Sequence, residues 1–253
     1  MRRSSSPDDF AGDPRLKACG DDSNRKVEIH DRIRELEASI RETAVRTGRD
    51  PAAVRTLLVS KTVPEDKILE AFKAGVQDFG ENRVQELIEK KRKMPMGLKW
   101  HMIGYLQTNK VKQVAGEVEL IQSLDRVELA REIDRQAALK KIEKVPCLIQ
   151  VNSSGETTKF GLPPGDAEAF AGQIKNLRIQ LRGIMTIGPR TQDESEIRRA
   201  FRLTSDLFKR LAGKFSSAEW NILSMGMSSD YKIAIEEGAT LLRIGSAVFG
   251  KRK

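Results

Sequence analysis

Two stretches of the sequence share one pattern and indicate the fold: AFKAGVQDFG at residues 71–80 and AIEEGATLLRIG at residues 234–245. In each, the end of an amphipathic segment is followed by a glycine, a short apolar run and a second glycine. The first glycine suits the left-handed conformation that ends many helices, and the second lets the chain turn sharply after a strand. Repeated helix–strand units of this kind predict a parallel sheet.

The same alternation continues through the chain. Apolar runs predict eight strands, at residues 56–60, 76–79, 99–103, 118–122, 145–151, 181–186, 221–224 and 240–244. Amphipathic stretches predict helices at residues 27–47, 64–74, 83–93, 109–116, 126–141, 166–174, 194–211 and 230–237. Eight such units in about 200 residues predict an α/β fold, a single (β/α)8 TIM barrel with an N-terminal helix. An open doubly wound sheet is the alternative, but no glycine-rich phosphate loop follows the first strand.

Composition separates an N-terminal extension from the barrel. Residues 1–25 are rich in Ser, Asp, Gly and charge, so we predict a disordered extension there and a barrel domain over residues 26–253. The extension lacks the apolar segment of a secretory signal, and no run approaches the roughly 20 apolar residues that span a bilayer. With only two cysteines and two histidines, all scattered, we expect neither a disulfide framework nor a metal site. A cytoplasmic location is the default.

The charge balance is basic, with a net charge of +9 and a pI of about 9.6. A basic protein of this kind can bind nucleic acid or anionic metabolites. The charge is spread along the chain, however, and stretches such as residues 89–93 and 140–144 are typical of solvated helix faces. Aromatic residues make up 5% of the chain, which offers little surface for stacking bases. We therefore expect no nucleic acid as the main partner.

A lysine follows the first predicted strand. In a (β/α)8 barrel the active face lies at the C-terminal ends of the strands, so Lys61 is placed at the barrel mouth. A lysine amine forms a Schiff base with an aldehyde, and partial burial makes that amine more available. An ordinary surface lysine is the alternative, because the chain is rich in lysine.

The loops after the seventh and eighth predicted strands carry groups that suit a phosphate. Barrels commonly bind phosphates there, on backbone N–H groups near helix N-termini, and hydroxyls and glycines permit a close approach. The loops concerned are residues 224–230 (SMGMSSD), which lead into a helix, and Gly245 with Ser246. Each loop alone would also fit ordinary turn and cap chemistry. A closed barrel brings both loops beside Lys61, and this coincidence favours pyridoxal phosphate as the cofactor.

Arg243 lies near the end of the eighth strand, in an otherwise apolar run. A buried charge there is costly unless it has a partner. A contact with the pyridine nitrogen of the cofactor is one interpretation; it would keep that nitrogen unprotonated and make the ring a weak electron sink. A salt bridge with a barrel carboxylate such as Glu81 is the other, and the residues alone do not decide between them.

Taken together, these motifs resemble the pyridoxal phosphate homeostasis proteins, which are similar to the barrel domain of alanine racemase. The matching stretches are residues 59–62 (VSKT), 79–86 (FGENRVQE), 100–104 (WHMIG), 106–110 (LQTNK), 150–152 (QVN), 159–161 (KFG), 182–185 (RGIM), 223–230 (LSMGMSSD), 243–246 (RIGS) and 249–250 (FG). They run in the family's order over about residues 27–251. Several of these motifs together are highly specific, although any one alone would not be.

The resemblance implies a role for each candidate residue. Lys61 would be the Schiff-base lysine, Arg243 would contact the ring nitrogen, and Asn82 and Met185 would line the cofactor. The implied phosphate contacts are Ser224, Gly226, Met227, Ser228, Gly245 and Ser246. Tyr105 stands where the family often has His or Pro, which alters the barrel mouth.

The resemblance also implies a carrier or regulator of the free vitamin B6 pool rather than an enzyme. Alanine racemases use a second base, a tyrosine that a further β-rich domain supplies across a dimer, and we expect no such domain here. Without it the cofactor face would be open, which suits delivery to apo enzymes that use this cofactor, and we expect a monomer. A low-activity amino-acid racemase, with Tyr105 as a substitute base, is the alternative. A basic nucleic-acid-binding module is a less favoured third.

Overall fold

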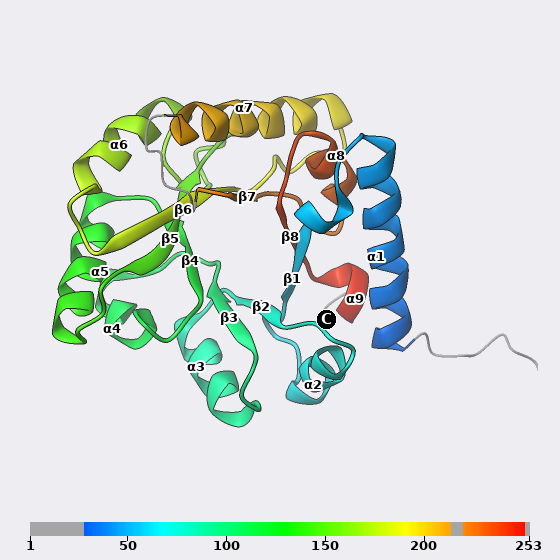
Figure 1. Ribbon diagram of the computed structural model, residues 1–253, viewed down its shortest axis with the longest axis horizontal. Coiled ribbons are helices and arrows are strands. Elements are labelled where there is room, and N and C mark those ends of the chain that lie inside the picture. Colours follow the sequence, from blue (N-terminus) through cyan, green and yellow to red (C-terminus); the bar gives the residue numbers. More distant parts are fainter. Residues whose placement is uncertain (1–27, 214–219, 251–253) are drawn as a thin grey trace, which may run out of the picture.

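Eight parallel strands close into a barrel in chain order, from β1 to β8 and back to β1 (Figure 1). The computed structural model describes residues 28–213 and 220–250. The strands are β1 (Arg55–Val59), β2 (Asp78–Glu81), β3 (Lys99–Met102), β4 (Leu120–Leu124), β5 (Val145–Val151), β6 (Ile179–Thr186), β7 (Ile222–Ser224) and β8 (Leu241–Ile244). The predicted TIM barrel is confirmed, and the open doubly wound sheet is wrong. The predicted extension over residues 1–25 lies outside the described residues.

Helices surround the barrel. They are α1 (Ile29–Arg46), α2 (Glu65–Lys73), α3 (Val84–Lys93), α4 (Val111–Val114), α5 (Val127–Leu139), α6 (Ala167–Ile174), α7 (Glu194–Ala212), α8 (Tyr231–Glu236) and α9 (Ser246–Phe249). Short 3-10 turns occur at Pro51–Ala53, Thr108–Lys110 and Pro164–Asp166. In the part of the chain that the structure describes, no helix combines the length and apolar character needed to cross a membrane.

The barrel closes where β1 meets β8. Leu57 lies opposite Arg243 and Leu58 opposite Ile244, so the first and last strands are neighbours although about 190 residues separate them. On its other side β1 pairs with β2, with Val59 opposite Gly80. This register places the end of β1 between the ends of β8 and β2, which is the geometry that the candidate site requires.

Successive residues of each strand face opposite sides of the barrel wall. The inward apolar side chains form one buried cluster that fills the barrel interior, and its members are Leu57, Val59, Ile103, Leu120, Leu148, Met185, Ile222 and Leu241. A larger apolar core lies between the wall and the helices. Gly80 is also inward-facing, because a Cβ there would lie 2.6 Å from Leu57 Cδ2 and 3.0 Å from Ile103 Cδ1. The interior is therefore packed rather than hollow.

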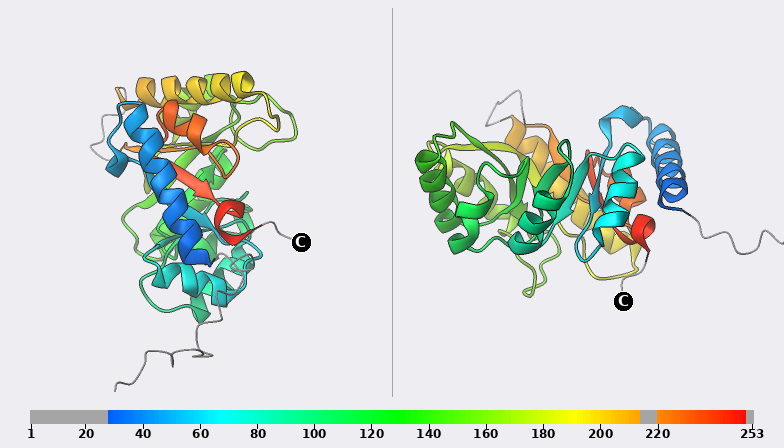
Figure 2. Two further views of the ribbon diagram at one scale, coloured as in Figure 1. Left: turned by 90° about the vertical axis from the view of Figure 1, so that its right-hand side faces the viewer. Right: turned by 90° about the horizontal axis from the view of Figure 1, so that it is seen from below.

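The N-terminal helix α1 packs outside the barrel against α2, α8 and α9 (Figure 1), and Figure 2 shows it at the outer edge of the molecule. Its apolar side is buried at spacings of three and four residues by Ile29, Ile33, Leu36 and Ile40. The helix thus covers the part of the wall where β8 and β1 close the barrel.

Several element boundaries differ by one or two residues from the sequence-based expectation, and two differences have a clear physical reason. We predicted a second strand at residues 76–79, but β2 begins at Asp78, because Val76 N–H is used to cap α2 by donating to Ala71 O at 3.2 Å. Gly75, at φ 99°, makes the turn that permits this cap. We also predicted no helix after the last strand, whereas α9 follows β8 directly. Its four residues are too few for the periodicity of a helix to be visible in the sequence.

Candidate functional site

Lys61 follows β1 and is half-buried at the C-terminal end of the barrel. Leu58 of β1 lies opposite Ile244 of β8, so the segment with Lys61 leaves the sheet at the same end as the loop that starts at Gly245. On the other side, Ser60 N–H donates to Gly80 O at 3.0 Å, which places β2 next to it. The fold therefore brings the predicted lysine to the barrel mouth beside one of the two predicted phosphate loops.

The turn after Lys61 is held by charged side chains of α3. Thr62 has a left-handed backbone with φ 58°, which is unusual for a β-branched residue. Its N–H donates to Glu86 Oε1 at 2.5 Å. Lys90 Nζ donates to the same carboxylate at 2.6 Å and to Ser60 O at 2.6 Å. The conformation of the chain on both sides of Lys61 therefore depends on α3.

A buried carboxylate lies behind this turn. Glu81 is fully buried; its Oε1 accepts from Ser60 Oγ at 2.7 Å and from Lys90 Nζ at 2.8 Å. Burial raises the pKa of Glu81 despite these two donors. Its Oε2 has no hydrogen-bond partner among the described residues. Burial also acts to raise the pKa of Glu86, but the bonds from Lys90 and the Thr62 N–H outweigh it, and that pKa is lowered.

The loops after β7 and β8 are joined by one hydroxyl. Ser228 Oγ accepts from Gly245 N–H and from Ala247 N–H, each at 3.2 Å. A hydroxyl that accepts two bonds can still donate its own proton. The two predicted phosphate loops thus meet at one point of the mouth, where N–H and O–H groups converge.

The β7 loop has no room for a side chain at its glycine. Gly226 has φ 91°, and a Cβ there would lie 2.5 Å from Ala234 Cβ. Met227 N–H donates to Asp230 Oδ1 at 2.5 Å. Burial raises the pKa of Asp230, although the bond from Met227 and the charge of Arg243 act to lower it. The loop therefore packs tightly against the start of α8.

A cavity of about 540 Å³ opens beside this loop, between the segment after β6 and the start of α8. Its lining includes Lys159, Arg190, Met227 and Asp230. Lys159 reaches it from the loop after β5, and its Nζ donates to Gly188 O at 2.6 Å. Two cationic side chains, Lys159 and Arg190, thus lie beside the β7 loop, and Lys159 is also paired with Glu156 at 2.5 Å.

Arg243 is buried in the barrel wall, with 4% of its surface exposed. Nη1 donates to Ser224 Oγ at 2.8 Å and Nη2 donates to Thr186 O at 2.6 Å. Burial lowers the pKa of Arg243 to about 10, and the charge of Asp230 opposes this shift. The proposed salt bridge with Glu81 is wrong, because the carboxylate of Glu81 is used by Lys90 and Ser60 on the other side of β1. Among the described residues both hydrogen-bond partners of Arg243 are uncharged oxygens, and the guanidinium has further N–H groups that can donate to a ligand.

Ser224 occupies a different position from the other phosphate candidates. Its hydroxyl is fully buried, accepts from Arg243 and donates to Gln122 Oε1 at 2.7 Å. This hydroxyl lies in the barrel interior rather than in the loop. The structure therefore brings Gly226, Met227 and Ser228 together with Gly245 and Ser246 at the mouth, and places the Ser224 side chain behind Arg243.

Of the remaining candidates, Met185 lies in the barrel interior and Asn82 on the loop after β2. Met185 is fully buried at the end of β6, opposite Ser224 of β7. Asn82 is half-buried just after β2, and Gly104 lies so close that a Cβ there would be 2.3 Å from Asn82 O. Tyr105 is 40% exposed; its ring stacks on Phe160 with 4.3 Å between centroids, and the Arg126 guanidinium lies 4.5 Å above it. The second tyrosine, Tyr231, is bonded through its hydroxyl to Ser39 Oγ at 2.9 Å.

Sequence reasoning missed the residues that support the site. Lys90 and Glu86 were part of a charged stretch on α3, and only their spacing of four residues marked them as a pair. Gln122 and His101 sit within predicted strands, where a polar side chain in an apolar run is the available signal.

The described part of the chain holds no metal-binding cluster, that is, no group of three or more His, Cys, Asp or Glu side chains arranged around one point. Burial raises the pKa of the Cys147 thiol, which makes it a poor nucleophile.

Comparison with known proteins finds one family and relatives that share one name. Residues 36–253 match the alanine racemase N-terminal domain family. The pyridoxal phosphate homeostasis protein of Aquifex aeolicus is 41% identical over 225 residues, which cover 88% of this chain and 98% of that protein. The protein of the same name from Pseudomonas aeruginosa is 40% identical over 226 residues, with 88% and 96% covered.

Solved structures show the same likeness. PipY of Synechococcus elongatus with PLP bound is 33% identical to this chain and has a TM-score of 0.77, with 88% of this chain and 100% of PipY covered. An alanine racemase of Clostridium difficile has a TM-score of 0.67 at 16% identity, with 86% of this chain and 57% of the racemase covered. The second similarity concerns the barrel fold alone.

Proposed function

The chain belongs to the alanine racemase N-terminal domain family and, within it, to the pyridoxal phosphate homeostasis proteins, and we propose that Lys61 holds the cofactor as a Schiff base. The protein binds pyridoxal 5'-phosphate and serves the homeostasis of this form of vitamin B6. The observation that carries the role of Lys61 is its position: a half-buried lysine at the end of β1, next to the loop that begins at Gly245.

The residues at the mouth fit a phosphorylated pyridine. Gly226 lets the loop pack closely on α8, and Ser228 gathers the N–H groups of Gly245 and Ala247 at one point. Hydroxyls and backbone N–H groups are the donors that a phosphate accepts. Arg243 supplies a buried donor whose two hydrogen-bond partners in the described chain are neutral oxygens. A ring nitrogen in contact with this guanidinium would remain unprotonated, because arginine does not readily release its proton.

Each candidate then has a proposed task. Lys61 contributes the amine, Arg243 orients the ring, and Asn82 and Met185 line its sides. The proposed phosphate contacts are Gly226, Met227, Ser228, Gly245 and Ser246. For Ser224 we propose an indirect contribution: its buried hydroxyl holds Arg243. When bound, the cofactor supplies an aldehyde carbon and an electron-withdrawing ring, and the protein supplies their orientation.

A carrier role is favoured over catalysis. Racemisation needs a second proton-transferring group on the face of the cofactor opposite the lysine, and such help is worth about 10²–10⁴-fold in rate. Tyr231 is engaged with Ser39 between α8 and α1. Tyr105 does lie after β3 near the mouth, but it is stacked between Phe160 and Arg126. The name of the relatives, homeostasis protein, agrees with a non-catalytic role.

Delivery of the cofactor to apo enzymes, a monomeric state and a cytoplasmic location remain part of this proposal. An exposed mouth supports delivery, since Tyr105 and Phe160 at its rim are 40% and 56% exposed. Weak racemase activity through Tyr105 is the second candidate. A nucleic-acid role has less support, because the basic stretch on α3 is largely paired: Lys91 with Glu117 at 2.7 Å and Lys93 with Glu65 at 2.8 Å.

Borohydride trapping tests the role of Lys61. Reduction of the cofactor-loaded protein followed by peptide mass mapping is expected to find the adduct on Lys61. Lys61→Ala should lose both the adduct and the visible absorption band, whereas Lys67→Ala, an exposed lysine on α2, should keep both. An adduct on another lysine, or none, would overturn the assignment.

Incubation with single alanine enantiomers separates a carrier from a racemase. Ready inversion of alanine that disappears in Lys61→Ala would favour the racemase.

A further inference from the structure

A chain of hydrogen bonds crosses the barrel interior from Arg243 to Asp78. Arg243 Nη1 donates to Ser224 Oγ at 2.8 Å, and Ser224 Oγ donates to Gln122 Oε1 at 2.7 Å. Gln122 Nε2 lies 3.3 Å from His101 Nδ1. His101 Nε2 lies 2.9 Å from Asp78 Oδ1. Five side chains from β8, β7, β4, β3 and β2 are thus linked through the centre of the molecule.

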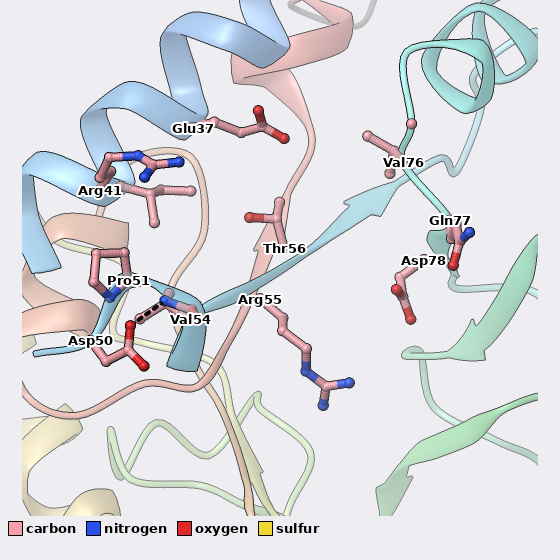
Figure 3. Close-up of a pocket in the computed structure, with 13 residues that line it drawn as sticks. Glu37, Arg41, Asp50, Pro51, Val54, Arg55, Thr56, Val76, Gln77 and Asp78 are labelled. Atoms are coloured by element: carbon pink, nitrogen blue, oxygen red, sulfur yellow. Dashed lines mark hydrogen bonds between the residues drawn. The ribbon is translucent and has the colours of Figure 1, made fainter.

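The chain connects the two ends of the barrel. Ser224 and Gln122 are fully buried, and His101 and Arg243 are each 4% exposed. Asp78 lies at the start of β2, where it lines a cavity of about 610 Å³ at the end of the barrel opposite the mouth. Figure 3 shows Asp78 and Arg55 extending into this cavity. The interior of the barrel therefore contains one polar path beside its apolar cluster.

The two ends of the path determine the direction of every bond in it. The guanidinium of Arg243 can only donate, so Ser224 Oγ must accept and gives its own proton to Gln122 Oε1. The amide of Gln122 then presents its NH₂ group to His101 Nδ1, which must accept. The imidazole proton is consequently on Nε2, from which it is donated to Asp78. The sequence of donors and acceptors is thus consistent from one end to the other.

Asp78 is suited to be the acceptor at the end. Burial acts to raise the pKa of its carboxyl, but the bond from His101 and the nearby cations Lys99 and Arg55 act against burial, and the pKa is lowered. An ionised carboxylate only accepts hydrogen bonds. The negative charge at Asp78 therefore favours the same bond directions that the positive charge at Arg243 favours.

We propose that Gln122 and His101 are positioning residues for the cofactor, which act on Arg243 through Ser224. The inference rests on the proposed function, since Arg243 is the group assigned to the cofactor ring. Without an acceptor at position 122, the Ser224 hydroxyl has no fixed proton direction and can turn its proton toward Arg243. The guanidinium then loses one of the two bonds that orient it in the wall.

The proton position on His101 tests the chain in the protein without cofactor. In ¹⁵N-labelled protein at about pH 8, where histidine side chains are ordinarily neutral, we expect a slowly exchanging proton on Nε2 of His101 and an unprotonated Nδ1. His30 is exposed and serves as the internal reference. In Gln122→Glu the NH₂ group that faces His101 Nδ1 is replaced by a carboxylate oxygen, which can only accept. A proton should therefore appear on Nδ1 of His101. A proton on Nδ1 in the wild type, or an unchanged His101 in Gln122→Glu, would contradict the chain.

Cofactor binding tests the positioning role. Gln122→Leu is expected to weaken pyridoxal phosphate binding roughly tenfold and to shift the absorption band of the bound cofactor, since one orienting bond of Arg243 is worth about that factor. The control is Gln136→Leu, the same change at a buried glutamine on α5 that is bonded to Glu132 outside the barrel. Equal affinity and equal spectra in the two variants would overturn the positioning role alone. A wild type that takes up no cofactor would overturn the proposed function as well, whatever the state of His101.

Discussion

Lys90 shows how far the environment of a single residue can depart from its sequence context. It sits in a run of basic residues on α3 that we interpreted as a solvated helix face, and the interpretation is wrong for this residue. Lys90 is 5% exposed and donates to Glu81, Glu86 and Ser60. A buried ammonium with three oxygen partners is satisfied, whereas its removal would leave buried carboxylates without a counter-charge.

Replacing Lys90 by methionine is therefore expected to destabilise the protein by about 3 kcal/mol, because Glu81 and the turn after Lys61 lose their shared donor. The turn that presents Lys61 should loosen at the same time, so cofactor binding should weaken. Urea unfolding of the protein without cofactor measures the first effect, and titration with pyridoxal phosphate measures the second.

Lys91→Met is the matched control, since it removes the neighbouring lysine and its exposed pair with Glu117. It should change the free energy of unfolding far less and leave cofactor binding as it is, because exposed ion pairs contribute little. Similar losses in the two variants would mean that the buried position of Lys90 has no special role.

At the scale of elements, ion pairs join the helices on one side of the barrel. Glu236 at the end of α8 pairs with Arg46 of α1 at 2.7 Å and with Arg198 of α7 at 2.5 Å. Glu237 pairs with Arg198 at 2.9 Å and with Arg202 at 2.9 Å. Helix α1 is therefore tied to α7 and α8, which follow it by about 150 residues or more, beside the closure of the barrel (Figure 1).

This network predicts a pH-dependent contribution to stability. Hydrogen bonds from Arg198 and Arg46 hold the pKa of Glu236 below its ordinary value of 4.5. The unfolded chain therefore takes up the proton first, so the contribution is complete above about pH 4.5 and is lost as the pH falls through the lower pKa of the folded state. We expect Glu236→Gln to cost about 1 kcal/mol at neutral pH and almost nothing in acid. Urea unfolding of both proteins across this range measures the difference.

Glu132→Gln offers the comparison within one helix, because Glu132 pairs only with Arg135 of the same α5 among its described ion pairs. Its effect should be smaller than that of Glu236→Gln and should not depend on contacts between helices. A constant difference between wild type and Glu236→Gln at every pH would show that the charge of Glu236 does not matter.

At the scale of the whole molecule, closure makes the barrel one cooperative unit. Because β1 pairs with β8, each half of the chain by itself would leave unpaired strands at both edges of its sheet. Trp100 in β3 and Trp220 before β7 are both buried and report on the two halves. In the single-tryptophan variants Trp220→Phe and Trp100→Phe, we expect fluorescence and circular dichroism to give the same urea midpoint.

Separate midpoints would indicate two independently folding halves, which is the other arrangement that a chain of 253 residues permits. The comparison is made within each variant, between fluorescence and circular dichroism, so a loss of stability caused by the substitution itself does not affect the conclusion.

Most of the fold could be predicted because it depends on local patterns. Apolar runs of strand length, glycines at helix ends and regular alternation indicated all eight strands and the parallel barrel. The boundaries were less accurate where a residue serves a cap, as at Val76, and α9 was too short to show a period. The loops after β7 and β8 were predicted to bind phosphate because glycine and serine after barrel strands suit a phosphate, and their role stays a prediction.

The supporting residues of the site could not be predicted, because they depend on contacts between distant segments. Lys90 reaches Ser60 across 30 positions and Ser224 reaches Gln122 across 102. A polar residue in an apolar run, such as Gln122, indicates that a partner is needed, but the local pattern does not say which residue supplies it. The same holds for Arg243, whose bonds to Ser224 and Thr186 replaced the salt bridge with Glu81 that the residues alone allowed.

The sequence by itself determined the barrel, the place of Lys61 at its mouth and the loops suited to phosphate, since periodicity and turn chemistry are local properties of the chain. Only the tertiary structure decided which polar side chains became buried partners. Closure of the sheet brought Arg243, Ser224, Gln122, His101 and Asp78 into one path, and α3 placed Lys90 behind the turn of Lys61. The physical reason is that a buried polar group must find a partner wherever the fold provides one, and that choice is made in space rather than along the chain.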